Sequence, residues 1–320
     1  MNKRPARSLA AELDRFISPF RIDGSGKFHL KSYKTNEKGG LDKAEGEKIL
    51  EANRQRLSDF QERLYAQGRW SVLVILQGMD ASGKDSAIKA IFEGVNPQGC
   101  EVSSFKQPTP HELDHDFLWR SVIALPERGR IGIFNRSYYE ECLVTRVHPE
   151  LLKRERIPPR LVTRNIWRER FEDIAAFERY LSRNGTVILK FFLNLSSQEQ
   201  RSRFLDRLEQ PAKMWKFSMN DATERGWWHR YQAIYQDIVR HTSTPVAPWY
   251  VVPADHKWFA RVVIGSVLIS TLERLNLAFP RADKASLEEF KAVRKALERE
   301  GKAGTKRAAK VAERVEKKRG

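Results

Sequence analysis

The chain has 320 residues, of which 41% are hydrophobic and 31% are charged, so it can form a hydrophobic core and is not a disordered chain. Its formal net charge of +17 favours a polyanionic partner: a nucleic acid, an anionic membrane surface or a phosphate-rich substrate. No stretch reaches the ~18 apolar residues that span a bilayer, and the two cysteines, Cys100 and Cys142, offer neither a disulfide framework nor the spacing of a metal site.

Residues 1–41 predict an irregular N-terminal arm, because GSGKFHLKSYKTNEKGG is polar and rich in glycine and lysine. The basic N-terminus lacks the apolar core of a signal peptide. Together with the two cysteines, this favours a soluble protein of the reducing cytoplasm. A helix is expected over residues 42–67, where apolar side chains recur at helical spacing. They are Ile49, Leu50, Leu57, Phe60 and Leu64.

A continuous apolar run, WSVLVILQ at residues 70–77, predicts the first strand. Its lack of alternation indicates a strand that is buried on both faces of a parallel sheet. Helical patterns separate it from four further strand candidates, at residues 101–105, 130–135, 187–193 and 248–252. This alternation predicts an α/β fold, in which a parallel sheet is flanked by helices on both faces.

Residues 196–230 mix arginines, tryptophans and turn formers, and we expect a helical excursion from the sheet there, where a mobile lid would sit. Residues 281–320 are helical in composition and contain 14 basic and 7 acidic residues. We therefore divide the chain into the arm, one α/β domain over residues 42–280 and a basic helical tail.

The first strand is followed by GMDASGKD, residues 78–85, which fits the Gly-x-x-x-x-Gly-Lys pattern of a phosphate-binding loop, or P-loop. Gly78 and Gly83 allow the backbone to curl so that consecutive N–H groups point inward. The N-terminus of the following helix adds partial positive charge, and Lys84 adds a full charge. The loop therefore predicts a cradle for phosphate oxygens.

Acidic residues distinguish this loop from that of common ATPases and GTPases. The residue after the lysine is usually Ser or Thr, whose hydroxyl binds magnesium, whereas here Asp85 follows and Ser86 comes next. Asp80 places a carboxylate near the phosphates, and the two negative charges repel each other. A carboxylate at this position is therefore expected only where it binds a metal ion or takes part in a proton transfer. The loop residues that we expect to bind substrate phosphates are Gly78, Ala81, Ser82, Gly83, Asp85 and Ser86.

A second polar cluster follows the strand at residues 130–135, in the sequence RIGIFNRSYYEE. Asn135, Arg136 and Glu140 belong to it. Because the carboxyl ends of parallel strands line the active crevice, we expect a metal-facing residue and a phosphate-binding arginine here. A solvated polar turn is the alternative, and the neighbouring P-loop favours a functional role.

Three further basic residues are candidates for binding phosphate. Lys106 precedes Gln-Pro in a turn that resembles the Arg-Glu-Pro turn of thymidylate kinases, which holds the phosphate of the acceptor; an ordinary surface lysine is the alternative. Arg203 and Arg207 share a helix face in the lid-like segment. They could close over a phosphoryl group, or they could form a solvated basic face.

Together these motifs resemble the polyphosphate kinase 2 family. The matching stretches are GMDASGKD, SSFKQPTPHELDHDFLWR, GIFNRSYYEE, RVHPE, KMWKFS and STPVAPWYVVPADHKWFAR, which extend from about residue 20 to about residue 275. Many kinases share the P-loop. The combination of WKFS, APWYVVPADHKWFAR and a P-loop with Asp in place of Ser or Thr is more specific.

The resemblance implies a P-loop kinase fold with a helical lid, inorganic polyphosphate as the phosphoryl donor, and a homo-oligomer that is a dimer or a tetramer. It also implies dependence on magnesium, with manganese as the alternative. Carried over by position, Asp80 organises the magnesium and the attacking phosphate oxygen, and Lys84 is the P-loop lysine. Arg136 is the catalytic arginine after the strand at residues 130–135, and Arg203 and Arg207 lie in the lid.

Two positions depart from patterns that are common in the family. Many members have Asp where this chain has Asn135, which moves more of the metal binding to Asp80. Many members that act on diphosphates have Asn where this chain has Glu140. The Glu version resembles the subgroup that accepts AMP and carries it on to the triphosphate, so we expect AMP and ADP as acceptors, with guanine nucleotides as the alternative.

The basic tail lies outside the resemblance, and it could hold polyphosphate, help assembly or form a solvated helix. Two other functions compete with the polyphosphate kinase interpretation. One is an ATP-dependent nucleoside monophosphate kinase of the thymidylate kinase kind. The other is a basic nucleic-acid-binding P-loop protein, although the sequence contains no recognition module for nucleic acids and we expect no dedicated nucleic-acid partner.

Overall fold

The computed structural model describes residues 12–215 and 217–316, with side chains up to residue 300. The chain forms two compact units, Met1–Ala278 and Phe279–Gly320. The ends of the predicted arm and tail, residues 1–11 and 317–320, lie outside the described residues.

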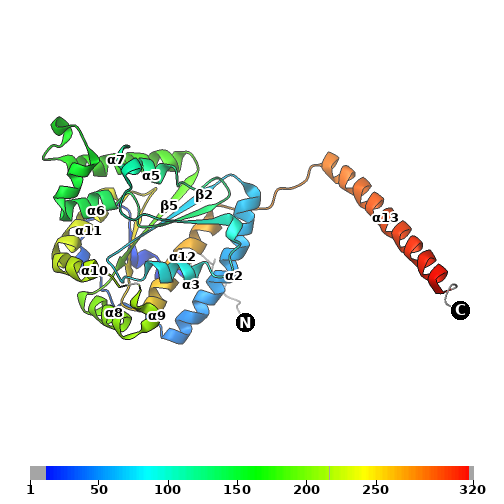
Figure 1. The fold of residues 1–320 in the computed structure, drawn as a ribbon, viewed down its shortest axis with the longest axis horizontal. Coiled ribbons are helices and arrows are strands. Elements are labelled where there is room, and N and C mark those ends of the chain that lie inside the picture. Colours follow the sequence, from blue (N-terminus) through cyan, green and yellow to red (C-terminus); the bar gives the residue numbers. More distant parts are fainter. Residues whose placement is uncertain (1–11, 216, 317–320) are drawn as a thin grey trace, which may run out of the picture. The chain divides into compact units, whose positions relative to one another are not determined.

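A six-stranded sheet forms the centre of the first unit, with the strand order β1-β6-β5-β2-β4-β3 (Figure 1). Its five parallel strands are β2 (Ser71–Gln77), β3 (Cys100–Ser104), β4 (Ile131–Asn135), β5 (Thr186–Asn194) and β6 (Trp249–Pro253). All five strands predicted from the sequence are confirmed, each to within one residue at either end. The predicted α/β class with a mainly parallel sheet is therefore correct.

The sixth strand, β1 (Arg21–Ile22), pairs antiparallel with β6 at one edge of the sheet. It lies in the segment for which the sequence predicted only irregular structure, and that part of the expectation was wrong. Three 3-10 helices belong to the same segment: η1 (Asp14–Phe16), η2 (Ser18–Phe20) and η3 (Leu30–Ser32). Phe16 and Phe20 are buried in the core. A two-residue strand carries no periodicity, so only its pairing with β6 reveals it.

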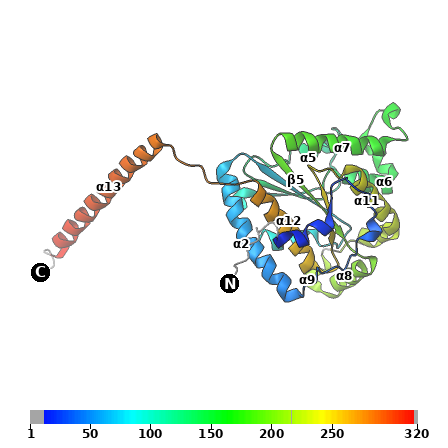
Figure 2. The same ribbon diagram turned by 180° about the vertical axis from the view of Figure 1, so that it is seen from behind.

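Helices cover both faces of the sheet (Figures 1 and 2). The side chains of β2 alternate between two hydrophobic clusters, with Val72 and Val74 in one and Leu73 and Ile75 in the other. The first cluster includes residues of α2 (Lys43–Gln67), α3 (Lys84–Ile91) and α12 (Lys257–Arg274). The second includes residues of α6 (Glu140–Val147), α7 (Ile166–Arg183) and α11 (Trp228–Thr242). The central strand is therefore buried on both faces, as its apolar run predicts.

Local signals explain why α2 begins and ends where the sequence predicts. Asp42 accepts a hydrogen bond from the Glu45 amide, and the Glu45 side chain accepts one from the Asp42 amide, which is a complete capping box. Gly68 ends the helix in the left-handed conformation, with φ of 59°. The expected helix over residues 42–67 is confirmed.

The lid segment, which we define as residues 196–230, is helical as expected. It contains α8 (Ser197–Glu209), α9 (Pro211–Met214), α10 (Met219–Glu224) and η7 (Arg225–Trp227), and α11 begins at its end. The remaining short elements of the first unit are η4 (Pro97–Gly99), α4 (Pro110–Leu113), α5 (Trp119–Val122), η5 (Pro149–Glu155) and η6 (Pro159–Leu161).

The second unit is a single long helix, α13 (Lys284–Glu316). Its side chains up to residue 300 include four exposed large apolar residues: Leu287, Phe290, Val293 and Leu297. Charged side chains on the same helix pair with one another, as in Arg294–Glu298 at 2.9 Å. Across the described part of the chain, no helix is both long enough and apolar enough to cross a membrane.

A fully buried ion pair lies between β5 and α7. Lys190 Nζ and Glu178 Oε2 are 2.5 Å apart, and both side chains are shielded from solvent. Glu178 Oε1 also accepts hydrogen bonds from the hydroxyls of Tyr138 (2.9 Å) and Tyr139 (2.8 Å). These tyrosines lie in the connection between β4 and α6. The Lys190–Glu178 pair therefore holds this connection in place.

We expect Lys190→Met to lower the free energy of unfolding by about 3–5 kcal/mol, because it leaves the Glu178 carboxylate buried without its cation. Urea unfolding followed by circular dichroism measures this. The double variant Lys190→Met with Glu178→Gln is the control, and it should recover part of the loss. A single variant as stable as the wild type would show that the ion pair does not stabilise the folded protein.

Candidate active site

The P-loop connects the end of β2 to the start of α3. Gly83 precedes α3 with φ of 106°, a conformation that glycine adopts without strain. At Gly78, a Cβ atom would lie 2.8 Å from Ser82 Oγ and 3.1 Å from the Leu193 carbonyl oxygen. Both predicted glycines are therefore required by the shape of the loop. Ala81 has φ of 62°, so this strained residue depends on its neighbours to hold it.

Lys84 is the first residue of α3 and is buried, with 8% of its surface exposed. Its Nζ atom donates hydrogen bonds to the carbonyl oxygens of Gly78 (2.7 Å) and Met79 (3.3 Å). Burial lowers the pKa of Lys84 from 10.5 to about 8, and the nearby charge of Arg136 acts in the same direction, while acidic neighbours oppose the shift. Keeping Lys84 charged in this buried position therefore costs free energy.

We expect kcat/KM for a phosphate-rich substrate to fall as pH rises above about 8, because Lys84 of the free enzyme then loses its charge. The unfolded chain retains its proton up to the ordinary pKa of 10.5, so the free energy of unfolding should increase with pH between those two values. Steady-state rates and urea midpoints from pH 7 to 10 measure both effects. If kcat/KM stayed constant above pH 8, the rate would not depend on the charge of Lys84, which would contradict this prediction.

Arg136 lies directly after β4, beside the P-loop, because β4 pairs in parallel with β2. Its Nη2 atom is 2.8 Å from Asp80 Oδ1. The negative charge of Glu140 raises the pKa of Arg136, and that of Asp80 acts in the same direction. Arg136 has φ of 63° and its amide donates to the Leu76 carbonyl oxygen, so a strained backbone presents this side chain to the loop.

Two other residues of the second cluster also face the P-loop. Asn135 Nδ2 donates to Asp85 Oδ1 across 2.5 Å. Burial raises the pKa of the Glu140 carboxyl, against the opposing charges of Arg136 and Lys84. The structure therefore brings the predicted residues of the two strand ends together in one site.

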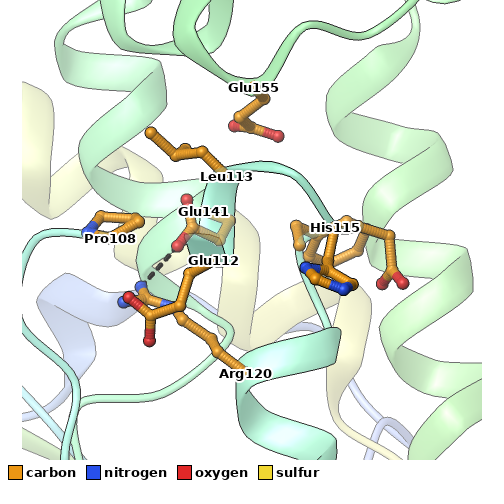
Figure 3. A pocket seen from close by; sticks show the side chains of 9 residues that line it. Pro108, Glu112, Leu113, His115, Arg120, Glu141 and Glu155 are labelled. Atoms are coloured by element: carbon orange, nitrogen blue, oxygen red, sulfur yellow. Dashed lines mark hydrogen bonds and ion pairs between the residues drawn. The ribbon is translucent and has the colours of Figure 1, made fainter. Parts of the chain in front are cut away.

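Lys106 follows β3, and its side chain is exposed. Its carbonyl oxygen accepts a hydrogen bond from Arg120 Nη1 at 2.7 Å. Figure 3 shows Arg120 paired with Glu141 among the residues that line a small pocket. Arg120 Nη2 and Glu141 Oε1 are 2.6 Å apart. Burial raises the pKa of Glu141 to about 7. Sequence reasoning did not select this pair, which fixes the backbone of the Lys106 turn.

The two predicted lid arginines differ in their surroundings. Arg207 is partly exposed and lies 3.6 Å from Asp221, on α10. Arg203 is buried, and its guanidinium donates to backbone carbonyl oxygens, among them those of Ala81 (2.9 Å) and Ser82 (3.0 Å). The sequence offered Arg203 either a role over the phosphoryl group or a place on a solvated basic face, and in this structure its guanidinium bonds the P-loop backbone. Helical spacing alone does not distinguish these environments.

Asp221 lies on α10, 3.6 Å from Arg207, and sequence reasoning did not select it. Burial raises the pKa of its carboxyl, and the charge of Asp80 acts in the same direction. Asp221 follows the WKFS motif, which was used only to recognise the family, and no local signal links it to the P-loop. Only the packing of α10 brings it into the electrostatic surroundings of Asp80.

A model of the family described as Polyphosphate kinase 2 (PPK2) matches residues 40–280, which is most of the chain. This chain belongs to the polyphosphate kinase 2 family. It is 48% identical over 250 residues to the ADP-polyphosphate phosphotransferase of Rhodopseudomonas palustris, covering 78% of this chain and 86% of that protein. It is 42% identical over 272 residues to the AMP/ADP-polyphosphate phosphotransferase of Meiothermus ruber, covering 84% of this chain and 98% of that protein.

The solved structures include a polyphosphate kinase 2 from Arthrobacter aurescens, which is similar to this protein with a TM-score of 0.78 and 36% identity. The similarity covers 91% of this chain and 98% of that one. The family recognised from the sequence motifs and the P-loop kinase fold are therefore both confirmed. Most of the tail lies beyond the matched residues, as expected.

The site of this polyphosphate kinase 2 member has a donor set that fits a hard divalent cation. Asp80 and Asp85 each offer carboxylate oxygens within the P-loop. Within residues 12–215 and 217–300, the Asp80 carboxylate accepts a side-chain hydrogen bond at Oδ1, from Arg136, and none at Oδ2. The same residues contain no group of three acidic, histidine or cysteine side chains that could hold a metal. A cation held by one or two carboxylates together with substrate phosphates is the arrangement that Mg²⁺ favours.

Proposed function

We propose that this protein transfers the terminal phosphoryl group of inorganic polyphosphate to AMP and ADP. It is a polyphosphate-dependent nucleotide kinase. The observation that carries the proposal is the pairing of the P-loop with Arg136 and Glu140 in a chain of the polyphosphate kinase 2 family. The names of the two relatives from Rhodopseudomonas palustris and Meiothermus ruber support polyphosphate as donor and adenine nucleotides as acceptors.

The terminal phosphate of polyphosphate binds at the P-loop amides and Lys84, and Arg136 neutralises charge on the transferred group. An oxygen of the nucleotide's terminal phosphate attacks that phosphorus in line. A new P–O bond forms while the bond to the next phosphate of the donor breaks, and the shortened polyphosphate leaves with the electron pair. The attacking phosphate is already anionic near neutral pH, so catalysis is positioning and charge neutralisation, without a covalent intermediate on the enzyme.

Asp80, together with Asp85, would hold a divalent cation, for which we propose Mg²⁺ with Mn²⁺ as the alternative. The cation supplies additional positive charge to the phosphate oxygens. The ion pair of Asp80 with Arg136 fixes the orientation of both side chains before substrate arrives, so less ordering is required on binding.

Glu140 is the proposed determinant of the acceptor. To attack the same phosphorus, AMP must sit about one phosphate unit deeper than ADP, so AMP presents an uncharged sugar where ADP presents a phosphate. If the Glu140 carboxylate lies beside that position, it does not repel the uncharged sugar of AMP, but it does repel the phosphate of ADP. We expect Glu140→Asn to shift the ratio of kcat/KM values from AMP towards ADP by ~10-fold, the scale of one charged interaction.

Rates with AMP and ADP at saturating polyphosphate, measured on the wild type and the Glu140→Asn variant, test this. An unchanged ratio would exclude Glu140 as the determinant. Glu140→Gln is the matched control for size, and it should move the ratio in the same direction.

The proposed function is tested by exchanging the donor. Purified protein is incubated with Mg²⁺ and either polyphosphate or ATP, with AMP or ADP as acceptor, and the nucleotides are resolved by chromatography. Formation of ADP and ATP from AMP and polyphosphate is the expected result. Transfer to a monophosphate from ATP alone would favour a monophosphate kinase of the thymidylate kinase kind instead.

A further inference from the structure

The outward side of the P-loop backbone is occupied by side chains of this protein. The carbonyl oxygens of residues 80 to 82 accept hydrogen bonds from side chains of α8. That of Asp80 accepts from Gln200 Nε2 at 2.9 Å, and those of Ala81 and Ser82 accept from Arg203 Nη1. The carbonyl and the following N–H of a planar trans peptide point in opposite directions, so the bonds at Asp80 and Ser82 orient the amides of Ala81 and Gly83 towards the phosphate side. The Ser82 amide donates to the Met79 carbonyl oxygen at 3.0 Å, within the loop.

Every N–H group of the Arg203 guanidinium donates a hydrogen bond within the protein. Nε donates to Glu199 Oε1 at 2.8 Å, and Nη2 donates to the carbonyl oxygens of Ala254 (2.6 Å) and Asp255 (3.0 Å). With the two bonds from Nη1 to the P-loop, all five N–H groups have an acceptor. Arg203 therefore joins three segments, namely α8, the P-loop and the turn after β6, and it has no donor left for a phosphate.

The conformation of Ala81 supplies independent support. Its φ of 62° is uncommon and unfavourable for a residue with a Cβ atom, so the surroundings must impose it. Among the described residues, the side chain that bonds the Ala81 carbonyl is that of Arg203. The arginine therefore holds the peptide at the centre of the loop.

Gln200 extends this arrangement to the far end of the lid segment. Its side chain is buried, with 1% of its surface exposed. Its Oε1 atom accepts from Arg225 Nη1 at 2.8 Å while its amide donates to the Asp80 carbonyl. Arg225 also donates to the Ser197 carbonyl oxygen at 3.1 Å. A continuous path of hydrogen bonds therefore runs from η7, which follows α10, through α8 to the P-loop.

We infer that Arg203 and Gln200 are positioning residues that hold the P-loop in its phosphate-binding shape, and that Arg225 couples the position of the lid segment to that loop through Gln200. The inference rests on the proposed function for its kinetic consequences. Its structural content concerns the free protein: removing either side chain should loosen the loop even before any substrate binds.

The first test compares Arg203→Lys with Arg203→Met. Lysine keeps the charge but cannot reach the acceptors on three segments, so both variants should lose kcat/KM for polyphosphate to a similar extent, by ~10–100-fold, the usual scale for misplaced binding groups. The KM for the nucleotide should change less than twofold. A lysine variant that retains most of the activity while the methionine variant loses it would indicate direct phosphate binding, and would overturn the inference. Arg179→Lys, at an exposed position of α7, is the matched control.

Hydrogen exchange of the free enzyme provides a readout that does not depend on activity. Amides of residues 78–85 should exchange at least ~10-fold faster in Arg203→Lys than in the wild type, because their opening costs less free energy. Exchange in β2 should be unchanged. Equal protection of the loop in both proteins would refute the inference even if the wild type uses polyphosphate. A wild type that does not use polyphosphate would refute the proposed function alone.

The coupling through Gln200 is tested by a double-mutant cycle with Gln200→Leu and Arg225→Met, read by the same loop exchange and by kcat/KM for polyphosphate. If the path is continuous, the double variant should be no worse than Gln200→Leu alone. Additive losses would show that Arg225 acts elsewhere. Gln198→Leu, at an exposed position of the same helix, is the control and should match the wild type.

Discussion

Replacement of Lys84 by methionine is expected to lower kcat for phosphoryl transfer by ~10³-fold or more, which is the scale reported for removing a cation from a phosphoryl-transfer site. Methionine preserves the length and the apolar stem of the lysine but removes its charge. Lys84 is the buried cation nearest the loop carbonyl oxygens, at 2.7 Å from that of Gly78. Without it, the site loses the charge that offsets the oxygens of the bound phosphate.

The same substitution should leave the protein folded and equally or more stable, because burial already disfavours the charged lysine and lowers its pKa to about 8. Single-turnover transfer and urea unfolding distinguish the two effects. Lys89→Met, at an exposed position of α3, is the control and should retain full activity. A Lys84→Met enzyme within tenfold of the wild type would remove Lys84 from the catalytic machinery.

Replacement of Asp80 by asparagine should lower kcat by ~10²–10³-fold, the range observed when one preorganised electrostatic group is removed. Asparagine keeps the shape of the side chain and can still accept a hydrogen bond from Arg136 across the 2.8 Å contact. It loses the negative charge, so a divalent cation should bind more weakly at the P-loop. The concentration of Mg²⁺ that gives half-maximal rate should therefore increase.

The cation dependence is the decisive measurement for Asp80. A variant with a reduced rate but an unchanged Mg²⁺ titration would show that Asp80 orients Arg136 and does not hold the cation. Asp59→Asn, on the exposed face of α2, is the matched control. Both properties of that variant should equal those of the wild type.

The recognisable parts of the site are those with a local signature. GMDASGKD identifies the P-loop through its glycines and lysine, because the backbone must curl in a way that few residues permit. The cluster at Asn135 and Arg136 was found because strand ends meet at one edge of a parallel sheet, and register places Asn135 opposite Leu76 of β2. Both deductions use only chain order and strand period.

The surroundings of Arg203 lie beyond what this reasoning can predict. Its spacing from Arg207 correctly predicts that both lie on one helix, yet one is buried against the P-loop backbone and the other pairs with Asp221. Whether an arginine faces substrate or carbonyl oxygens depends on segments more than fifty residues away in the chain. Helical periodicity carries no information about those partners.

The sequence by itself determined the α/β class, the five parallel strands, helix α2, the P-loop and the family. Each rests on a local pattern of apolar period, caps or glycines, which is written in consecutive residues. Only the tertiary structure decided the short strand β1, the buried Lys190–Glu178 pair, the approach of Asp221 to Asp80 and the attachment of α8 to the P-loop. These depend on which side chains distant in sequence meet in the folded core, where a polar group buried without a hydrogen-bond partner costs free energy.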